Sequence, residues 1–305
     1  MIKRLLVTSD LSEHAAYAVH RGALLAEQHK AQLLLFHVID DEILHQNILE
    51  LIQKGTLEAA DRLLKDAEAT LREQANTLAA KHVFNYSVHV EQGIDFVNII
   101  HQARDDQADL IVLGAHGKHF IQDVFLGTTV EKVVRDSDRS VLVVRNPPED
   151  DYARILITVD LSEMSRQTLA FAQSLAPDDS ELHILHAYQY PTEEEAAISA
   201  STAEQYMENL EEQAKVQLDQ FLAEFDFGTQ RVERIVKFGY PPAVIRMVAE
   251  QQKTDLTLVG VHSHADLRHL LLGSTAEHAL RELSCDVLVV RYPPPASNSH
   301  ESKQE

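Results

Sequence analysis

The chain reads RLLVTSDLSE over residues 4–13 and repeats this stretch as RILITVDLSE over residues 154–163. Three further pairs recur in the same order: LLLFHV with LHILHA, ADLIVLG with TDLTLVG, and LGTTVEKVVRDSDRSVLVVR with LGSTAEHALRELSCDVLVVR. The repeat covers about 145 residues, a typical size for one domain. The sequence therefore predicts two copies of one domain, at residues 1–146 and 152–292, joined by the charged turn NPPEDD and followed by a polar, disordered tail at 293–305.

Short apolar runs alternate with longer amphipathic stretches inside each copy, which is typical of β-α-β units. Runs such as LIVLG and VLVVR are apolar at successive positions, as in strands that are covered on both faces. The pattern predicts an α/β fold in which each copy is a doubly wound, open, parallel, five-stranded sheet of Rossmann-like type. Strands are expected near residues 3–9, 32–38, 86–91, 109–114, 140–145, 153–159, 181–187, 232–237, 255–260 and 286–291, with first-copy helices near 12–30, 57–81, 95–106 and 128–137.

Composition narrows the classes of partner. The 305 residues include 27 basic and 48 acidic side chains, and the resulting charge of −21 repels a nucleic-acid backbone. Cys285 is the single cysteine, which excludes an intrachain disulfide and fits a reducing compartment. The N-terminal stretch lacks a signal-peptide core, and no run of about 18 apolar residues occurs. We therefore expect a cytoplasmic protein with neither a nucleic acid nor a membrane as its partner.

Residues 114–129 read GAHGKHFIQDVFLGTT, and they follow a predicted strand at the edge of the sheet where ligands bind. Gly114 and Gly117 are expected to let the chain turn and let a ligand approach the backbone. Gly127 precedes the helix start T-x-x-E, where Thr128 is expected to act as the cap, as Ser274 does in the second copy. The positive end of that helix attracts phosphate. A glycine turn and a capped helix also occur in proteins that bind nothing, and the stretch matches neither a Walker loop nor the dinucleotide fingerprint.

The stretch resembles the nucleotide-binding motif of the universal stress protein family, Gly-x2-Gly-x9-Gly-Ser/Thr, at every position of the first copy. Both copies resemble the family over nearly their whole length, so the chain looks like a tandem universal stress protein. The resemblance implies ATP as the ligand, with Mg²⁺ carried on its phosphates. The implied contacts are Thr8, Asp10 and Val38 at the base end, and Gly114, His116, Gly117, Lys118, Gly127, Thr128 and Thr129 around the sugar and the triphosphate.

Several of these side chains also have a purely structural interpretation. Asp10 is either an acceptor for ribose or base donors or the N-cap of the following helix. Lys118 either meets a phosphate as a point charge or is solvated. His116 and His119 lack a carboxylate or cysteine at a recognised ligand spacing, so no metal held by the protein itself is expected.

The second copy reads GVHSHADLRHLLLGST and departs from the motif at Ser263, which replaces the second glycine. If that position needs a positive φ or a bare backbone against the ribose, serine costs about 1–2 kcal/mol, or about tenfold in affinity. The second site is therefore expected to be weaker or empty. Its residues are Asp160, Gly260, Gly273, Ser274 and Thr275.

No general base or arginine clamp is evident near the loop, so binding with little or no turnover is expected. The resemblance implies an ATP-binding stress-response or signalling protein whose nucleotide state changes its shape or its unidentified protein partner. A module that binds no nucleotide and a slow ATPase are the alternatives. The resemblance also implies that the last strands, 141–144 and 287–290, pair as an intrachain pseudo-dimer, which would cover two exposed strand edges, with a further homodimer left open. Residues 39–63 and 189–213 are interpreted as a mobile cap or as solvated helix extensions.

Overall fold

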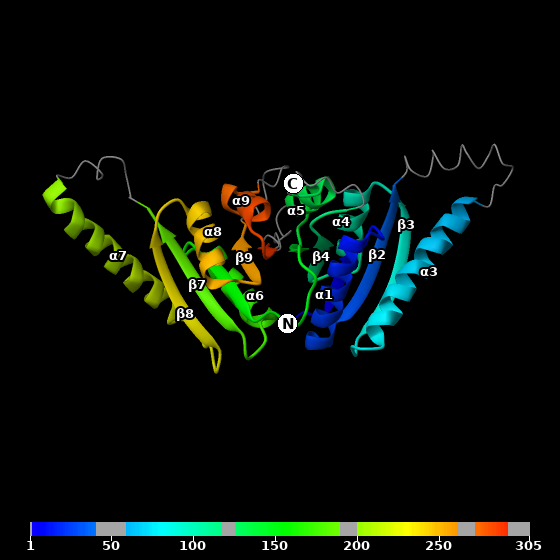
Figure 1. Cartoon of the computed structure of the whole chain (residues 1–305), viewed down its shortest axis with the longest axis horizontal. Coiled ribbons are helices and arrows are strands. Elements are labelled where there is room, and N and C mark those ends of the chain that lie inside the picture. Colours follow the sequence, from blue (N-terminus) through cyan, green and yellow to red (C-terminus); the bar gives the residue numbers. More distant parts are fainter. Residues whose placement is uncertain (1, 41–58, 118–125, 190–199, 262–271, 292–305) are drawn as a thin grey trace, which may run out of the picture.

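A computed structural model describes residues 2–40, 59–117, 126–189, 200–261 and 272–291 (Figure 1). The first half contains β1 (Arg4–Thr8), α1 (Glu13–His29), β2 (Gln32–Asp40), α3 (Ala59–Ala79), β3 (Asn85–Gly93), α4 (Asp95–Asp105), β4 (Leu110–Gly114), α5 (Thr128–Asp136) and β5 (Ser140–Val144). The second half contains β6 (Arg154–Val159), α6 (Glu163–Leu175), β7 (Glu181–Tyr188), α7 (Ala200–Leu222), β8 (Arg231–Phe238), α8 (Pro241–Gln252), β9 (Leu256–Gly260), α9 (Ser274–Glu282) and β10 (Asp286–Val290).

Every predicted strand and first-copy helix is present. The continuously apolar strands β4, β5, β9 and β10 lie in the middle of the sheet and are buried almost throughout, because helices cover both of their faces. Strand β3 instead alternates between exposed and half-buried positions, since it lies at an edge and only one of its faces is covered. The apolar pattern of each strand thus indicates whether one or both of its faces are covered.

All ten strands form one sheet in the order β3-β2-β1-β4-β5-β10-β9-β6-β7-β8. Each half is parallel and changes direction of winding once, between β1 and β4 in the first half and between β6 and β9 in the second. The halves meet where β5 and β10 pair antiparallel, with Leu142 opposite Leu288. The predicted pairing of the two last strands is therefore present, and it removes two edges that would otherwise be open.

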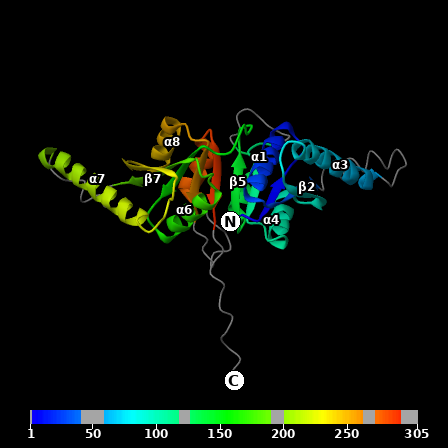
Figure 2. The same ribbon diagram turned by 90° about the horizontal axis from the view of Figure 1, so that it is seen from below.

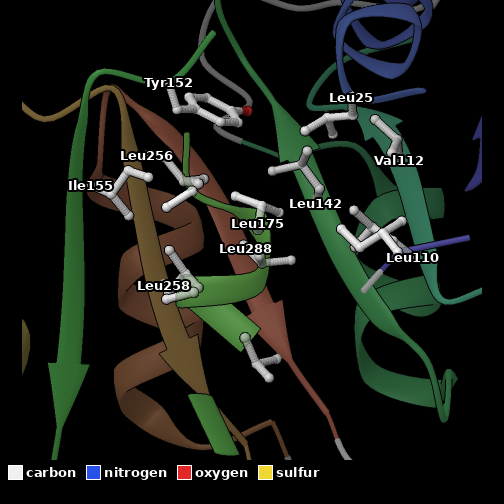
Figure 3. Close-up of a cluster of buried hydrophobic side chains, with 14 of the residues drawn as sticks. Leu25, Leu110, Val112, Leu142, Tyr152, Ile155, Leu175, Leu256, Leu258 and Leu288 are labelled. Carbon is white, nitrogen blue, oxygen red and sulfur yellow. The ribbon is translucent and has the colours of Figure 1, made fainter. Parts of the chain in front are cut away.

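Helices cover the two faces of this sheet as separate layers. Side chains of α1, α3, α6 and α7 pack into one apolar cluster, and those of α4, α5, α8 and α9 pack into the other. Each cluster crosses the seam between the halves; Leu110 and Leu142 of the first half lie beside Leu288 and Leu256 of the second (Figure 3). The helices α3 and α7 lie at opposite ends of the elongated molecule (Figure 2). The two halves therefore share their cores instead of being joined by the linker alone.

A buried polar cluster reinforces the seam at Asp286, which is 2% exposed. Tyr152, just after the linker, donates its hydroxyl to Asp286 Oδ2 at 2.7 Å, and the backbone N–H of Arg145 donates to Oδ1 at 2.8 Å. The guanidinium of Arg21 lies over the Tyr152 ring, 3.9 Å from its centroid. At the equivalent position of the first half, Ser140 Oγ accepts the backbone N–H of Arg291 at 3.1 Å.

Several predictions fall outside the described residues. These are the tail at 293–305 and most of the two cap segments, of which the structure describes only the parts that belong to β2, α3 and α7 and the residue after β7. The domain limits at 146 and 152 stay a prediction. Within the described ranges, no helix is both long enough and apolar enough to span a bilayer.

Candidate functional site

The carboxyl edge of the sheet at the switch between β1 and β4 brings together three distant segments of the first copy. Asp10 follows β1, Gly117 follows β4, and α5 begins at Thr128. A Cβ built on Gly117 would lie 2.7 Å from Asp10 Oδ2, so this carboxylate approaches the glycine closely. Gly127 N–H donates to Ala115 O at 2.9 Å and ties the start of α5 to the residue after β4.

Asp10 is not the N-cap of α1, so that interpretation of the sequence is wrong. Leu11 has a positive φ of 64°, and this turn makes Ser12 the cap. The Ser12 hydroxyl accepts Ala15 N–H at 3.1 Å, while Asp10 Oδ1 accepts Ser12 N–H at 3.0 Å. Asp10 therefore stabilises the turn before the helix with one oxygen and directs the other towards Gly117.

Gly117 is required for space and not for backbone conformation. The described glycines with a positive φ are Gly93, Gly228 and Gly239, so the positive-φ explanation for Gly117 is wrong. A side chain at this position would instead press on the Asp10 carboxylate. Because a carboxylate is the far end of a side chain, the expected response is displacement of Asp10 and not unfolding.

Gly114 is explained by packing, which differs from the predicted approach of a ligand. A Cβ at this position would lie 3.2 Å from His14 O and 3.5 Å from Ala15 Cα, because α1 crosses the end of β4. The equivalent Gly260 is tighter, with Thr168 Oγ1 only 2.5 Å from such a Cβ. Both glycines allow the first helix of each half to lie close against the sheet.

Helix α5 begins at Thr128, the predicted cap, and so starts one residue earlier than predicted. Gly127 is the N-cap and no side chain caps the helix, so the prediction that Thr128 forms a capping box with Glu131 is wrong. Thr128 is the first helical residue, where its hydroxyl is not placed to accept the N–H two residues on. Glu131 Oε1 instead lies 3.4 Å from Arg281 Nη2 of the other half. Gly273 likewise caps α9 in place of Ser274.

Thr129, the second residue of α5, donates its hydroxyl to Asp95 Oδ2. Asp95 is the first residue of α4 and was not predicted as a site residue. Its sequence signal is an acidic residue at the first turn of the helix that follows the third strand, on the same edge of the sheet. Lys132, one turn further along α5, places its ammonium 4.7 Å from the centre of the Phe96 ring.

Thr8 and Val38 lie on the two strands that border the switch. Thr8 ends β1 opposite Phe36, and Val38 lies two residues further along β2. Val38 is half-buried against the apolar cluster under α4 and α5. It therefore extends past the end of β1 at the carboxyl edge, where the prediction puts the base.

His116 is half-buried after β4, and its ring centroid lies 6.1 Å from that of His14. Burial lowers the pKa of His116, and the positive charge of Arg145 lowers it further. The lowered pKa favours the neutral imidazole, which weakens His116 as a source of positive charge for a phosphate. Lys118, the other candidate of this loop, lies outside the described residues.

The second copy has an acidic residue at the equivalent position, but this carboxylate accepts different hydrogen bonds. Asp160 Oδ1 accepts the hydroxyls of Ser162 and Ser165, both at 2.5 Å, and also Ser162 N–H at 3.0 Å. Ala15 stands in place of Ser165 in the first copy, so Asp10 has no equivalent of this hydroxyl. Thr275 follows Ser274 in the first turn of α9, and Ser263 lies outside the described residues.

The universal stress protein family matches the chain twice, over residues 1–145 and 151–291. A universal stress protein of Synechocystis is 27% identical over 308 residues, covering 95% of this chain and 100% of that protein. Universal stress protein G of Escherichia coli O157:H7 is 29% identical over 142 residues, covering 46% of this chain and 99% of that protein.

Solved structures share the two-domain arrangement. A universal stress protein from Archaeoglobus fulgidus covers 95% of this chain and 98% of its own at 19% identity, with a TM-score of 0.61. A protein described as a putative universal stress protein from Pseudomonas aeruginosa covers 95% and 93% at 21% identity, with a TM-score of 0.65. The similarity to these solved structures shows the fold, and the two matches to the family model show the family. The chain belongs to the universal stress protein family, as a tandem member with two copies of the family domain.

Proposed function

We propose that the first copy binds an adenine nucleotide, ATP together with Mg²⁺, at the carboxyl edge between β1 and β4. The protein would then act as an ATP-binding stress-response or signalling protein with little or no turnover. The observation that carries this proposal is the close approach of the Asp10 carboxylate to Gly117, beside the start of α5. An acceptor, a bare stretch of backbone and a helix N-terminus are what a sugar and its phosphates require.

The start of α5 suits phosphate binding. No side chain caps the helix, so its first backbone N–H groups remain available to an anion in the described structure. Gly127 has a φ of −70°, which any residue adopts, and a Cβ there would meet Ala115 O at an ordinary 3.4 Å. Neither conformation nor internal packing demands this glycine, which favours a role in leaving room outside the helix.

The remaining contacts follow the family motif. Thr8 and Val38 would lie at the base, and His116, Lys118, Thr128 and Thr129 would lie around the sugar and phosphates. Mg²⁺ would be held mainly by phosphate oxygens and water, as is usual for this ion. It would neutralise phosphate charge when bound.

The hydrogen bond that Arg145 makes supports slow or absent turnover of the nucleotide. Arg145 contributes to the lowered pKa of His116, yet its guanidinium donates to Leu280 O of α9. This contact engages Arg145 with the other half of the molecule. Phosphoryl transfer needs a positive group at the transferred phosphate.

The two copies are proposed to act as an intrachain pseudo-dimer with one working site. The second site would be weaker or empty, because the serine hydroxyls hold Asp160 against α6. An unidentified protein partner would respond to the nucleotide state of the first copy. Whether two chains associate further is a matter for measurement of mass in solution.

The test uses the Gly117→Ser variant and a matched Gly273→Ser control in the second copy, where a Cβ meets no atom within 4 Å. Nucleotide released from freshly purified, denatured protein is identified first, and ATP is then titrated by calorimetry. Gly117→Ser is expected to lose about tenfold in affinity, since displacing Asp10 costs about 1.4 kcal/mol, and Gly273→Ser is expected to match wild type.

Wild type that releases no nucleotide and gives no heat with ATP would leave the non-binding interaction module as the function. Release of phosphate at a steady rate, measured in the same samples, would instead favour the slow ATPase.

A further inference from the structure

A carboxylate lies between the first turns of two neighbouring helices in the first copy. Asp95 begins α4, and its Oδ1 accepts Phe96 N–H at 2.6 Å. Its Oδ2 accepts the hydroxyl of Thr129, the second residue of α5. Because α4 and α5 pack against each other, the carboxylate is held beside the start of α5.

The second copy has the same backbone turn without this carboxylate. Gly93 and Gly239, which precede α4 and α8, have similar positive φ values of 151° and 139°. Two residues later the first copy has Asp95 and the second has Pro241. Thr275 keeps the place of Thr129, so only the acidic partner differs. The copy that keeps the complete glycine motif is also the copy with the extra negative charge.

A negative charge at this place opposes the binding of a free nucleotide. The N-terminus of α5 attracts anions, and the Asp95 carboxylate, which accepts a hydrogen bond from the first turn of α5, cancels part of that attraction. A triphosphate without metal brings several negative charges to the same place and is repelled by Asp95. A divalent cation on the phosphates changes the sign of this interaction, because Mg²⁺ prefers carboxylate and phosphate oxygens.

We infer that Asp95 makes nucleotide binding by the first copy depend on a divalent cation. It selects the Mg²⁺ complex of the nucleotide over the free nucleotide, and Thr129 positions its carboxylate. The inference rests on the proposed function and adds to it the residue that selects the Mg²⁺ complex. The proline at the start of α8 predicts that any binding by the second copy lacks this dependence.

The experiment is calorimetric titration of the full chain with ATP, once with excess Mg²⁺ and once with a chelator. Wild type is compared with Asp95→Asn and Asp95→Ser, since serine also suits the start of a helix. Asp105→Asn is the matched control, because Asp105 is exposed at the opposite end of the same helix and its change alters the net charge equally.

Wild type is expected to bind the Mg²⁺ complex at least tenfold more tightly than free ATP. Both Asp95 variants are expected to reduce this ratio by about tenfold, equivalent to about 1.4 kcal/mol, mainly by binding free ATP better. Asp105→Asn is expected to keep the wild-type ratio. Circular dichroism and thermal unfolding of each variant establish that it is folded.

Two failures are distinguishable. If wild type binds ATP and both Asp95 variants keep the wild-type ratio, the role of Asp95 is overturned while the proposed function stands. If wild type binds ATP under neither condition, the proposed function itself is overturned and the inference is overturned with it.

Discussion

Equivalent residues of the two copies make different contacts, as Asp10 and Asp160 show. Asp10 accepts one backbone N–H with Oδ1 and turns Oδ2 towards Gly117. Asp160 has the hydroxyls of Ser162 and Ser165 on one oxygen. Hydroxyl donors occupy acceptor capacity that a ligand would need. The same residue type at equivalent positions of the repeat therefore does not make the same contacts.

Asp286 provides a test at the level of one residue. Burial raises its pKa above the ordinary value of 3.8, although Arg145 N–H, the Tyr152 hydroxyl and Arg21 lower it in part. The folded protein thus binds this proton more tightly than the unfolded chain. Stability from that proton is fully present below the ordinary pKa and is lost as the pH rises through the raised pKa.

Asp286→Asn removes this titration and keeps an acceptor for Arg145 N–H. Relative to the variant, wild type is expected to lose unfolding free energy as the pH rises above the ordinary carboxyl pKa. Urea unfolding at several pH values measures the difference. A difference between the two proteins that stays constant with pH would contradict the raised pKa of Asp286.

Helix starts show how a local pattern misplaces a cap by one or two residues. The pattern D-L-S-E allowed Asp10 as a cap and T-x-x-E predicted Thr128, yet the caps are Ser12 and Gly127. The positive φ of Leu11 shifts the first start, and the hydrogen bond from Gly127 N–H to Ala115 O sets the second. A helix begins where its backbone first becomes helical, and tertiary contacts decide that point.

Ser12→Ala is therefore expected to cost about 1 kcal/mol of unfolding free energy, because the Ala15 N–H loses its side-chain acceptor. Thr128→Ala is expected to stay within about 0.5 kcal/mol of wild type, since Thr128 is exposed and caps nothing. Chemical denaturation of both variants makes the comparison. A larger loss of unfolding free energy for Thr128→Ala would contradict the finding that Thr128 does not cap α5.

The strands of both halves form one sheet, and its apolar cores continue across the seam. The two halves are therefore expected to unfold together. Leu142 and Leu288 pair across the seam and are both fully buried. Apolar clusters on both faces continue from one half into the other. Cooperative unfolding follows where no boundary separates two sets of contacts.

Leu288→Ala is expected to cost about 2–5 kcal/mol, as for other large-to-small changes in a core. Hydrogen exchange is expected to accelerate in β4 of the first half as well as in β9 of the second. Calorimetry is expected to show one transition for wild type. Acceleration confined to the second half, together with two separate transitions, would indicate independent domains.

The fold followed from the sequence because its signals are local and are repeated. Continuous apolar runs predicted the inner strands, and their recurrence predicted two copies. The family resemblance implied that the last strands pair, and they do. The glycine motif lies at the carboxyl edge of the sheet, as predicted, because the carboxyl ends of parallel strands share one edge.

Contacts between residues distant in the sequence were decided only by the tertiary structure. Asp95 and Thr129 are 34 residues apart, and their hydrogen bond depends on how α4 packs against α5. The approach of Asp10 to Gly117 likewise depends on the distance between α1 and the end of β4. The sequence by itself determined the strands, the helices and the repeat, since these depend on local propensity and periodicity. The tertiary structure alone decided which atoms the Asp10 and Asp95 carboxylates approach, because that requires the placement of separate elements within ångströms.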